Sequence, residues 1–367
     1  MSVCRGSRDP TGHLRMIASR ISPNRSKEGR LTKASRSSSA VKPRWSVAWS
    51  CVISLSPVGQ VANLSGTCAS ARSTGWQPAL RKSQVLQDRR RTEPCQRQGG
   101  SATMKVGLCT IAFQEKPLSE VLEVATKCGF EAVEVWCKPP HGPGGFDPAY
   151  WVGIAEEIAA HLLGPPVIGS YLRGTEKDFD AQAARILQIA DALDSRLIRV
   201  WAGSKGSKDA TDADWDAVVA AYAQLAATAA DYRFCFERHA GTLTDDWQCA
   251  RKLLDRLPQP NIGLNYQFLR GETTEVVCGS LTEVTDRLFN VHVQNGRKLP
   301  DGSWKAADAE SGDLDYRVIV ATLKEISFAG HLETEFIRDG IGDPKSPAAK
   351  LAAARRECAF LKRLVGG

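Results

Sequence analysis

The sequence predicts a (β/α)₈ barrel over residues 104–367, and three observations support this fold class. From Met104 onward, short apolar runs alternate with amphipathic helical stretches, which is typical of parallel βα units. There are eight such runs, and the 264 residues from 104 to 367 are a usual length for this barrel. The first turn, residues 112–116, has no Gly-x-Gly-x-x-Gly pattern. Its absence disfavours an open doubly wound sheet that binds nucleotides.

The predicted strands are apolar along most of their length, as expected of strands that are buried on both faces. They cover residues 105–112, 131–137, 166–171, 196–202, 233–237, 261–266, 289–293 and 331–336. The helices between them carry start and stop signals. The first runs from Pro117 to Gly129, and others with clear signals cover 211–232, 244–257, 315–327 and 346–365.

Residues 1–103 are predicted to be a non-globular basic leader that lies outside the barrel. They are rich in Arg, Ser, Gly and Pro and show no sustained helical or strand period, which is typical of disordered segments. They hold 18 of the 48 Lys and Arg and 4 of the 41 Asp and Glu, so they carry +14 and residues 104–367 carry −7. A mis-assigned start, with Met104 as the true first residue, is the alternative to a transit-type leader. In both cases we expect a chain that starts at Met104 to fold.

The eleven cysteines are predicted to be unpaired. Four lie in residues 1–103, and the seven others are scattered without a Cys-x-x-Cys pair. Cys109, Cys137 and Cys235 fall inside apolar runs, where Cys is usually a small core residue. The apolar stretch 47–58 is too short to cross a bilayer. We therefore expect a cytoplasmic protein in a reducing setting, without a membrane span.

Polar side chains mark the carboxyl ends of four successive predicted strands, and this end of the barrel is where such folds carry their chemistry. The residues are Glu237, Gln267, His292 and Glu335. Because neighbouring strands lie about 5 Å apart, these side chains are expected to converge on one ion. Two carboxylates, an imidazole and an amide oxygen suit Mn²⁺, Mg²⁺, Co²⁺ or Zn²⁺. Glu333 shares a strand face with Glu335 and is the alternative ligand if the register differs by one residue pair.

Five short motifs carry a family resemblance. They are Glu237-x-His-x-Gly-Thr-Leu-Thr-Asp, Asn261-Ile-Gly-Leu-Asn-Tyr, Asn290-Val-His-Val, Gly312-Asp-Leu-Asp and Gly330-His-Leu-Glu-Thr-Glu. Their joint order over essentially all of 104–367 resembles the xylose isomerase-like superfamily, and most closely its sugar phosphate isomerase/epimerase group. The resemblance implies one divalent metal ion at Glu237, Gln267, His292 and Glu335. Many members have Asp where this chain has Gln267, so we expect weaker metal binding or a different ion.

The resemblance implies an isomerase or epimerase that acts on a sugar or sugar phosphate by proton transfer through an enediolate. Glu237 and Glu335 are then both metal ligands and the proton-transferring pair, on opposite faces of the substrate. Substrate contacts are expected from Glu134, His141, His239, Gln294 and Arg338. Arg199, Arg297 and Arg338 are the candidate partners of a phosphate or carboxylate, with an ion pair between Arg199 and Glu134 as the alternative.

Three other functions are weighed for the same fold. A lyase or dehydratase acting on a keto-inositol or a dehydroshikimate-like acid would use the same metal. A non-catalytic binding protein of the same fold is also an alternative, because Gln267 in place of Asp should weaken metal binding. A DNA-repair endonuclease is disfavoured, because residues 104–367 have only five His and a net charge of −7. The expected binding partner is therefore a small sugar or sugar phosphate. We expect the protein to bind neither nucleic acid nor a membrane, and the sequence leaves open whether it forms a homo-oligomer.

Overall fold

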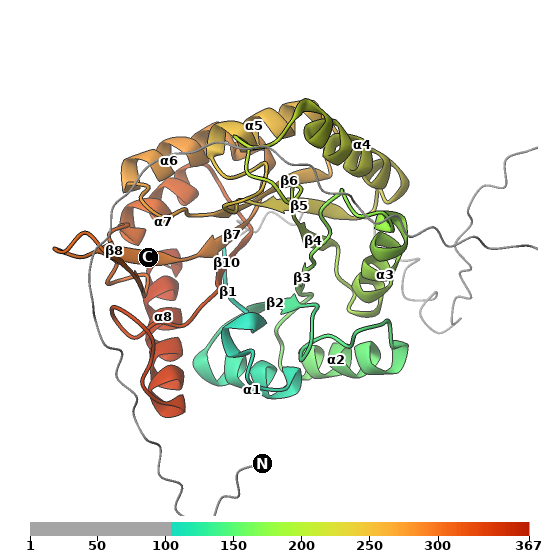
Figure 1. Ribbon diagram of the computed structural model, residues 1–367. Coiled ribbons are helices and arrows are strands. Elements are labelled where there is room, and N and C mark those ends of the chain that lie inside the picture. The colour runs from blue at the N-terminus through green and yellow to red at the C-terminus, as the bar shows by residue number, and fades with distance from the viewer. Residues whose placement is uncertain (1–103, 367) are drawn as a thin grey trace, which may run out of the picture. The chain divides into compact units, whose positions relative to one another are not determined.

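The computed structural model describes residues 104–366, in which eight parallel strands close into a barrel (Figure 1). The order around the barrel is β1-β10-β7-β6-β5-β4-β3-β2. The strands are β1 (Lys105–Cys109), β2 (Ala132–Trp136), β3 (Val167–Gly169), β4 (Leu197–Val200), β5 (Arg233–Glu237), β6 (Ile262–Gln267), β7 (Leu288–Val293) and β10 (His331–Thr334). The predicted fold class is thus confirmed, and the predicted leader lies outside the described residues.

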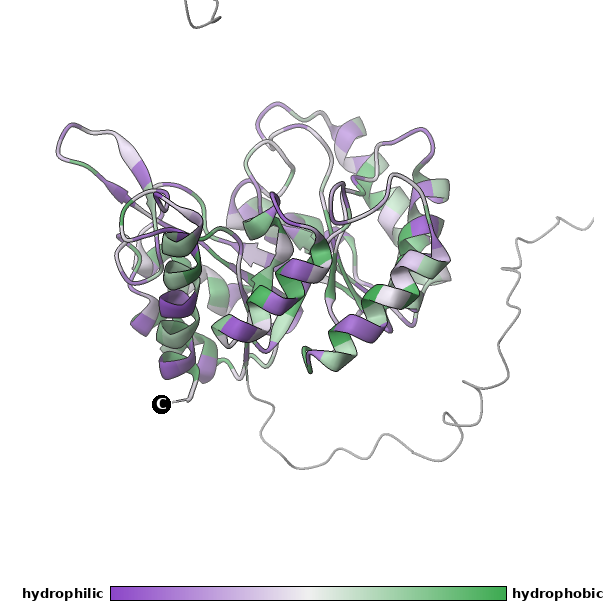
Figure 2. Cartoon of the chain, turned by 90° about the horizontal axis from the view of Figure 1, so that it is seen from below, coloured by the Kyte–Doolittle hydropathy of each residue, from purple (hydrophilic) through white to green (hydrophobic). Residues whose placement is uncertain are grey.

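Helices cover the outside of the barrel (Figure 1). They are α1 (Leu118–Cys128), α2 (Pro148–Ala160), α3 (Phe179–Ala192), α4 (Asp212–Thr228), α5 (Trp247–Arg256), α6 (Thr274–Glu283), α7 (Tyr316–Glu325) and α8 (Pro347–Gly366). Figure 2 shows hydrophilic and hydrophobic residues alternating along them, as in helices with one buried face. Val121, Leu122 and Ala125 of α1, for example, are fully buried.

The helix ends follow from capping residues, and the cap of α5 bears on the site. Gly129 takes a left-handed φ of 93° after α1, as the sequence predicts. The sequence places the cap of the fifth helix in Thr244-Asp-Asp246, and α5 starts directly after this segment, at Trp247. Asp246 is its N-cap, with its side chain accepting the Cys249 N–H at 2.6 Å. Thr244 is instead buried, and its hydroxyl donates to the Glu237 carbonyl at 2.7 Å, which fastens the end of β5.

One element is absent from the prediction. After β7 the chain forms an antiparallel hairpin of β8 (Asn295–Lys298) and β9 (Trp304–Ala307), labelled by β8 at the left of Figure 1. The indole of Trp304 lies against Gly296, where a Cβ would come within 1.8 Å of the ring. The base of the hairpin is held by the buried Asn295 amide, which donates to the Ala309 and Leu314 carbonyls at 3.1 and 2.9 Å.

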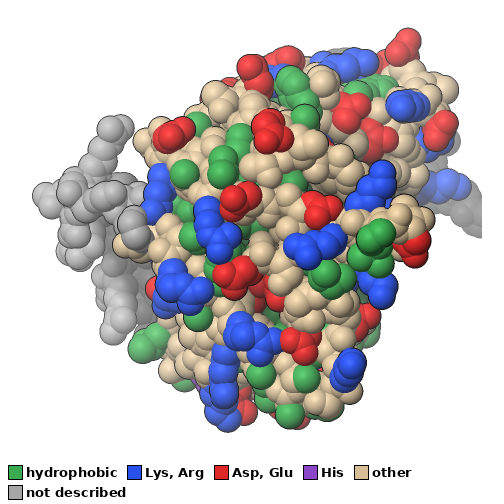
Figure 3. Space-filling model, turned by 90° about the vertical axis from the view of Figure 1, so that its left-hand side faces the viewer, with side chains coloured by type: hydrophobic (Ala, Val, Ile, Leu, Met, Phe, Trp, Pro, Cys, Tyr) green, Lys and Arg blue, Asp and Glu red, His purple; other side chains and the backbone are tan. Residues whose placement is uncertain are grey.

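Two further observations concern the cysteines and the helices of residues 104–366. Its seven cysteines are all free. None of the described helices combines the length and the apolar character that crossing a bilayer requires. On the face shown in Figure 3, basic and acidic side chains are interspersed rather than gathered into tracts of one sign.

Glu357 of α8 is a buried acid that ties down the loop after the hairpin. It is 7% exposed, and its carboxylate oxygens accept the Ala309 N–H at 3.1 and 3.2 Å. Burial, with Asp308 and Glu310 nearby, raises the pKa of Glu357 from 4.5 to about 8, although the hydrogen bond from Ala309 opposes this rise. Folding therefore favours the protonated acid, and the resulting stabilisation is lost as pH rises through about 8.

We expect Glu357→Gln to remove this pH dependence, because the amide is neutral at every pH. At about 1.4 kcal/mol per pKa unit, the wild-type free energy of unfolding should fall by a few kcal/mol more than that of the variant between pH 5 and 9. Urea unfolding at several pH values measures the difference. The exposed Glu325→Gln substitution at the end of α7 serves as the control. Parallel pH profiles for the wild type and Glu357→Gln would contradict the prediction.

Candidate functional site

The four predicted metal ligands meet at the carboxyl ends of β5, β6, β7 and β10. In the barrel, Gln267 of β6 pairs in register with His292 of β7. Glu237 of β5 pairs with Asn265 of β6. One terminal atom of the Gln267 amide lies 3.1 Å from His292 Nδ1, 2.9 Å from Glu237 Oε1 and 3.1 Å from Glu335 Oε2. The two carboxylates lie 4.0 and 3.8 Å from the same Nδ1. The expected convergence of these side chains is therefore present.

The surroundings of the Gln267 amide test whether these residues fit a metal ion. With its oxygen turned inward, the amide faces two carboxylate oxygens and an imidazole nitrogen, and only the imidazole can offer a hydrogen. The oxygens of this group repel one another unless a cation lies among them, either the His292 imidazolium or a bound ion. With its nitrogen inward, the amide instead has two hydrogens to donate among these three atoms. The donor set in the first orientation is one that divalent ions accept, so the residues fit a metal ion.

A buried ion-pair network lies next to this cluster. Arg199 Nη2 is 3.0 Å from Glu134 Oε1, and Arg199 Nη1 is 3.1 Å from Glu237 Oε2. The other oxygen of Glu134 accepts from His292 Nε2 at 2.9 Å. Gly169 of β3 makes room for the pair, since a Cβ there would lie 2.7 Å from Glu134 Oε1. Arg199 is therefore held inside the barrel by Glu134, as the alternative in the sequence analysis proposes.

The network decides which of the buried groups are charged. Burial alone would raise the pKa of Glu134, but Arg199 and His292 outweigh it and lower the pKa to about 2. Burial works against the imidazolium of His292, yet Glu134, Glu335 and Glu237 raise its pKa to about 10. For Glu237 and Glu335, burial outweighs the nearby cations, and their pKa values are raised. Raised carboxyl pKa values suit groups that exchange protons near neutral pH.

Two of the five predicted substrate contacts line a cavity at the barrel mouth. Gln294 follows β7, and its side-chain amide donates to Glu335 Oε2. His239 follows β5 and packs on Trp201 with ring centroids 4.4 Å apart. Both side chains are placed where a bound molecule would meet them.

The other three predicted contacts do not line this cavity, and their polar atoms contact other groups of the protein. Glu134 is buried between Arg199 and His292. His141 is fully buried, and its ring nitrogens lie 3.0 Å from Thr110 Oγ1 and 3.0 Å from the Lys116 carbonyl. Arg338 is ion-paired with Asp343 and does not line the cavity.

Glu333, the alternative ligand, lies one residue pair further into the barrel. It is fully buried and accepts the Asn290 side-chain N–H at 2.6 Å. It belongs to a different potential donor set, with Cys109, Glu134 and His292. In the described chain, Glu335 rather than Glu333 faces the Gln267 amide.

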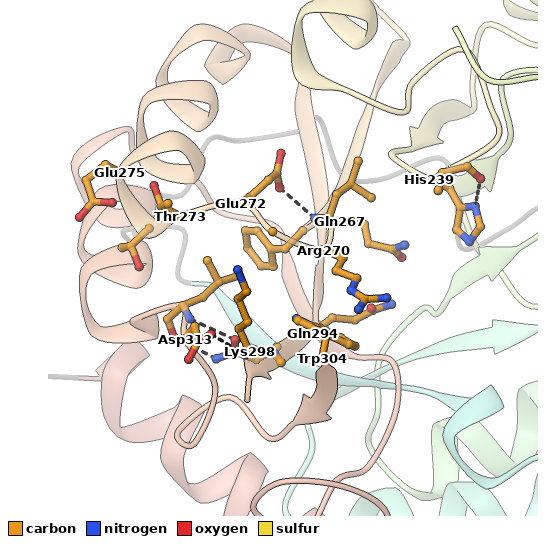
Figure 4. Close-up of a pocket in the computed structure, with 18 of the residues that line it drawn as sticks. His239, Gln267, Arg270, Glu272, Thr273, Glu275, Gln294, Lys298, Trp304 and Asp313 are labelled. Carbon is orange, nitrogen blue, oxygen red and sulfur yellow. Dashed lines mark hydrogen bonds between the residues drawn. The ribbon is translucent and has the colours of Figure 1, made fainter. Parts of the chain in front are cut away.

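The cavity also exposes residues that the sequence analysis missed. It has a volume of about 670 Å³ and is bounded by Gln267 and Gln294 on the side of the candidate metal ligands (Figure 4). Arg270, on the loop after β6, and Lys298 and Trp304, on the hairpin, line its other walls. These three residues come from segments in which the sequence analysis predicts no element.

Comparison with known proteins identifies relatives of two activities. The chain is 27% identical over 176 residues to 3-dehydroshikimate dehydratase of Bacillus anthracis, which covers 45% of this chain and 62% of that one. It is 38% identical over 78 residues to mannonate dehydratase of Saccharophagus degradans, which covers 20% of this chain and 19% of that one. The chain therefore spans less than two-thirds of either relative.

Solved structures share the fold at low identity. The probable 3-DHS dehydratase of Bacillus anthracis has a TM-score of 0.56 at 18% identity, covering 71% of this chain and 99% of that one. The D-allulose 3-epimerase of a Methylomonas species has a TM-score of 0.54 at 18% identity, covering 72% and 98%. The family model for the xylose isomerase-like TIM barrel matches residues 122–364, which is well over half of the chain. The chain thus belongs to the xylose isomerase-like TIM barrel family.

Proposed function

We propose that this protein is a divalent-metal-dependent isomerase or epimerase of a sugar or sugar phosphate. The observation that supports it best is the pair of carboxyl groups, of the buried Glu237 and the 13% exposed Glu335, that face the same Gln267 amide at 2.9 and 3.1 Å. They come from β5 and from the end of β10, with β6 and β7 between them. Two carboxyl groups on either side of one position can take a proton from one face of a carbon atom and return it to the other.

Glu237, Gln267, His292 and Glu335 would hold the ion, which when bound supplies Lewis-acid polarisation of a substrate carbonyl. Glu134 accepts from His292 Nε2 and thereby turns Nδ1 toward the two glutamates. Arg199 keeps Glu134 ionised and fixes the second oxygen of Glu237. The Gln294 amide fixes Oε2 of Glu335. These contacts orient both proton-transferring groups before a substrate arrives.

A dehydratase is the second candidate, because both curated relatives are named as dehydratases. Both reactions begin with removal of a proton next to a carbonyl or carboxylate, and both need a carboxyl or imidazole base at this place. They differ in whether the resulting anion is protonated again or loses a hydroxyl group. Glu237 and Glu335 would serve in either case, so the product decides between the two.

The test combines metal binding with hydrogen exchange. Chelator-treated protein, titrated with Mn²⁺ by calorimetry, should bind one ion per chain, and Gln267→Asp should bind it about tenfold tighter or better because the substitution adds a carboxylate. In D₂O with Mn²⁺, an epimerase should place deuterium on substrate carbon without loss of water, whereas a dehydratase should release one water. Absence of a stoichiometric ion, together with no exchange and no product, would favour a non-catalytic binding protein.

A further inference from the structure

The cavity beside the candidate site contains two cationic side chains that no carboxylate neutralises. Among residues 104–366, the Arg270 guanidinium has no ion pair or hydrogen bond, and its one aromatic contact is with Trp304, 5.2 Å from the ring centroid. Lys298 gives its backbone N–H to Asp313, but its ammonium group has no carboxylate partner in the described chain. Both residues line the cavity that Gln267 also lines (Figure 4).

Two of the three carboxylates that line the same cavity are already paired with arginines. Glu272 pairs with Arg238 at 2.7 Å and accepts the Leu269 N–H at 2.8 Å. Asp313 accepts the Lys298 backbone N–H at 2.8 Å and lies 3.5 Å from Arg297. Glu275 stands on α6 at the far edge of the cavity from Gln267 (Figure 4). The cavity lining therefore carries two cations without a carboxylate partner, Arg270 and Lys298, whereas arginines already contact Glu272 and Asp313.

The side chain of Arg270 is exposed, and two neighbouring segments place it beside the cavity. It follows Gln267 by three residues, on the loop that continues directly from β6. Its guanidinium lies over the Trp304 indole, which itself is packed on Gly296 of the hairpin. A stacked guanidinium is held in orientation and still presents paired N–H groups at its edge, a geometry that matches a carboxylate or a phosphate.

We propose that Arg270, together with Lys298, binds an anionic group of the substrate, either a carboxylate or a phosphate ester. The substrate class is then a sugar acid or sugar phosphate rather than a neutral sugar. This inference rests on the proposed function, since it assumes that the reacting carbon lies at Glu237 and Glu335. It replaces the three arginines that the sequence suggests for this role, because Arg199, Arg297 and Arg338 all contact carboxylates within the chain.

The experiment measures the binding of three probes to the full chain with Mn²⁺ present. The probes are D-mannonate, D-allulose 6-phosphate and neutral D-allulose, followed by tryptophan fluorescence in stopped flow so that binding precedes turnover. At least one of the anionic probes should bind ten times more tightly than D-allulose, and its advantage should shrink at high salt. Which anion gains more distinguishes a carboxylate site from a phosphate site.

Substitutions distinguish anion binding at Arg270 from a general effect of the protein's charge on anion affinity. Arg270→Gln should weaken binding of the favoured anion about tenfold or more, while D-allulose and Mn²⁺ bind as before. Arg270→Lys should recover part of the loss. The control is Arg185→Gln, which removes an exposed arginine from α3, outside the cavity. Equal affinity for all three probes, or equal behaviour of the Arg270→Gln and Arg185→Gln variants, overturns the inference and leaves the proposed function standing. If neither Mn²⁺ nor any probe binds, the proposed function fails and the inference fails with it.

Discussion

The Glu335→Gln variant should lose about 10²- to 10⁴-fold in turnover while keeping its fold. Glu335 Oε2 lies 3.1 Å from the Gln267 amide, and burial raises the pKa of its carboxyl group. Glutamine has the same shape but neither takes up nor releases a proton in this pH range. Deuterium exchange into substrate carbon, measured with saturating Mn²⁺, reports the chemical step directly, and thermal unfolding reports the fold.

The matched control for this variant is Glu333→Gln, on the same strand and the same face. Glu333 is fully buried and contacts Asn290 rather than Gln267, so its glutamine variant should exchange deuterium within a fewfold of wild type. A larger loss in Glu333→Gln than in Glu335→Gln would show that the register assigned to the reacting glutamate is wrong. Glu237→Gln should lose activity as Glu335→Gln does, because it removes the opposite member of the pair.

The barrel and the centre of the site were predictable because they depend on local pattern. Apolar runs buried on both faces define the eight strands, and an acid, amide or imidazole in such a run has few structural explanations. Glu237, Gln267, His292 and Glu335 stand out for this reason. Their shared placement at one end of the barrel then follows from parallel strand direction alone.

The predicted contacts that lie away from the cavity owe their placement to tertiary contacts. His141 follows β2 and resembles a residue of the barrel mouth, but its burial depends on Thr110 and Lys116, which lie 31 and 25 positions away in the sequence. The hairpin carried a usable signal, because Pro300-Asp-Gly302 is a turn sequence between two short segments. Arg270 carried none, since an arginine in a polar loop is usually solvated and only the hairpin gives it a partner.

Arg199→Met should be the most destabilising single change at the site. The guanidinium lies between Glu134 and Glu237, at 3.0 and 3.1 Å, and all three side chains are at least 95% buried. Methionine fills a similar volume but removes the guanidinium from two buried carboxyl groups, so that Glu237 Oε2 loses its ion pair and Glu134 keeps only His292. Removing one partner of a buried ion pair costs about 3–5 kcal/mol, so the free energy of unfolding in urea should fall by about that amount.

A double substitution identifies the cause of this loss. If uncompensated charge destabilises the Arg199→Met variant, then adding Glu134→Leu, which removes one of the stranded carboxylates, should cost less than the sum of the two single substitutions. If methionine simply packs poorly, the two effects should add. Arg199→Lys provides a folded variant for comparison should Arg199→Met not accumulate, because it keeps the charge and loses the fork that reaches both glutamates. A loss below about 1 kcal/mol in Arg199→Met, or strict additivity in the double variant, would mean that the network does not hold the site together electrostatically.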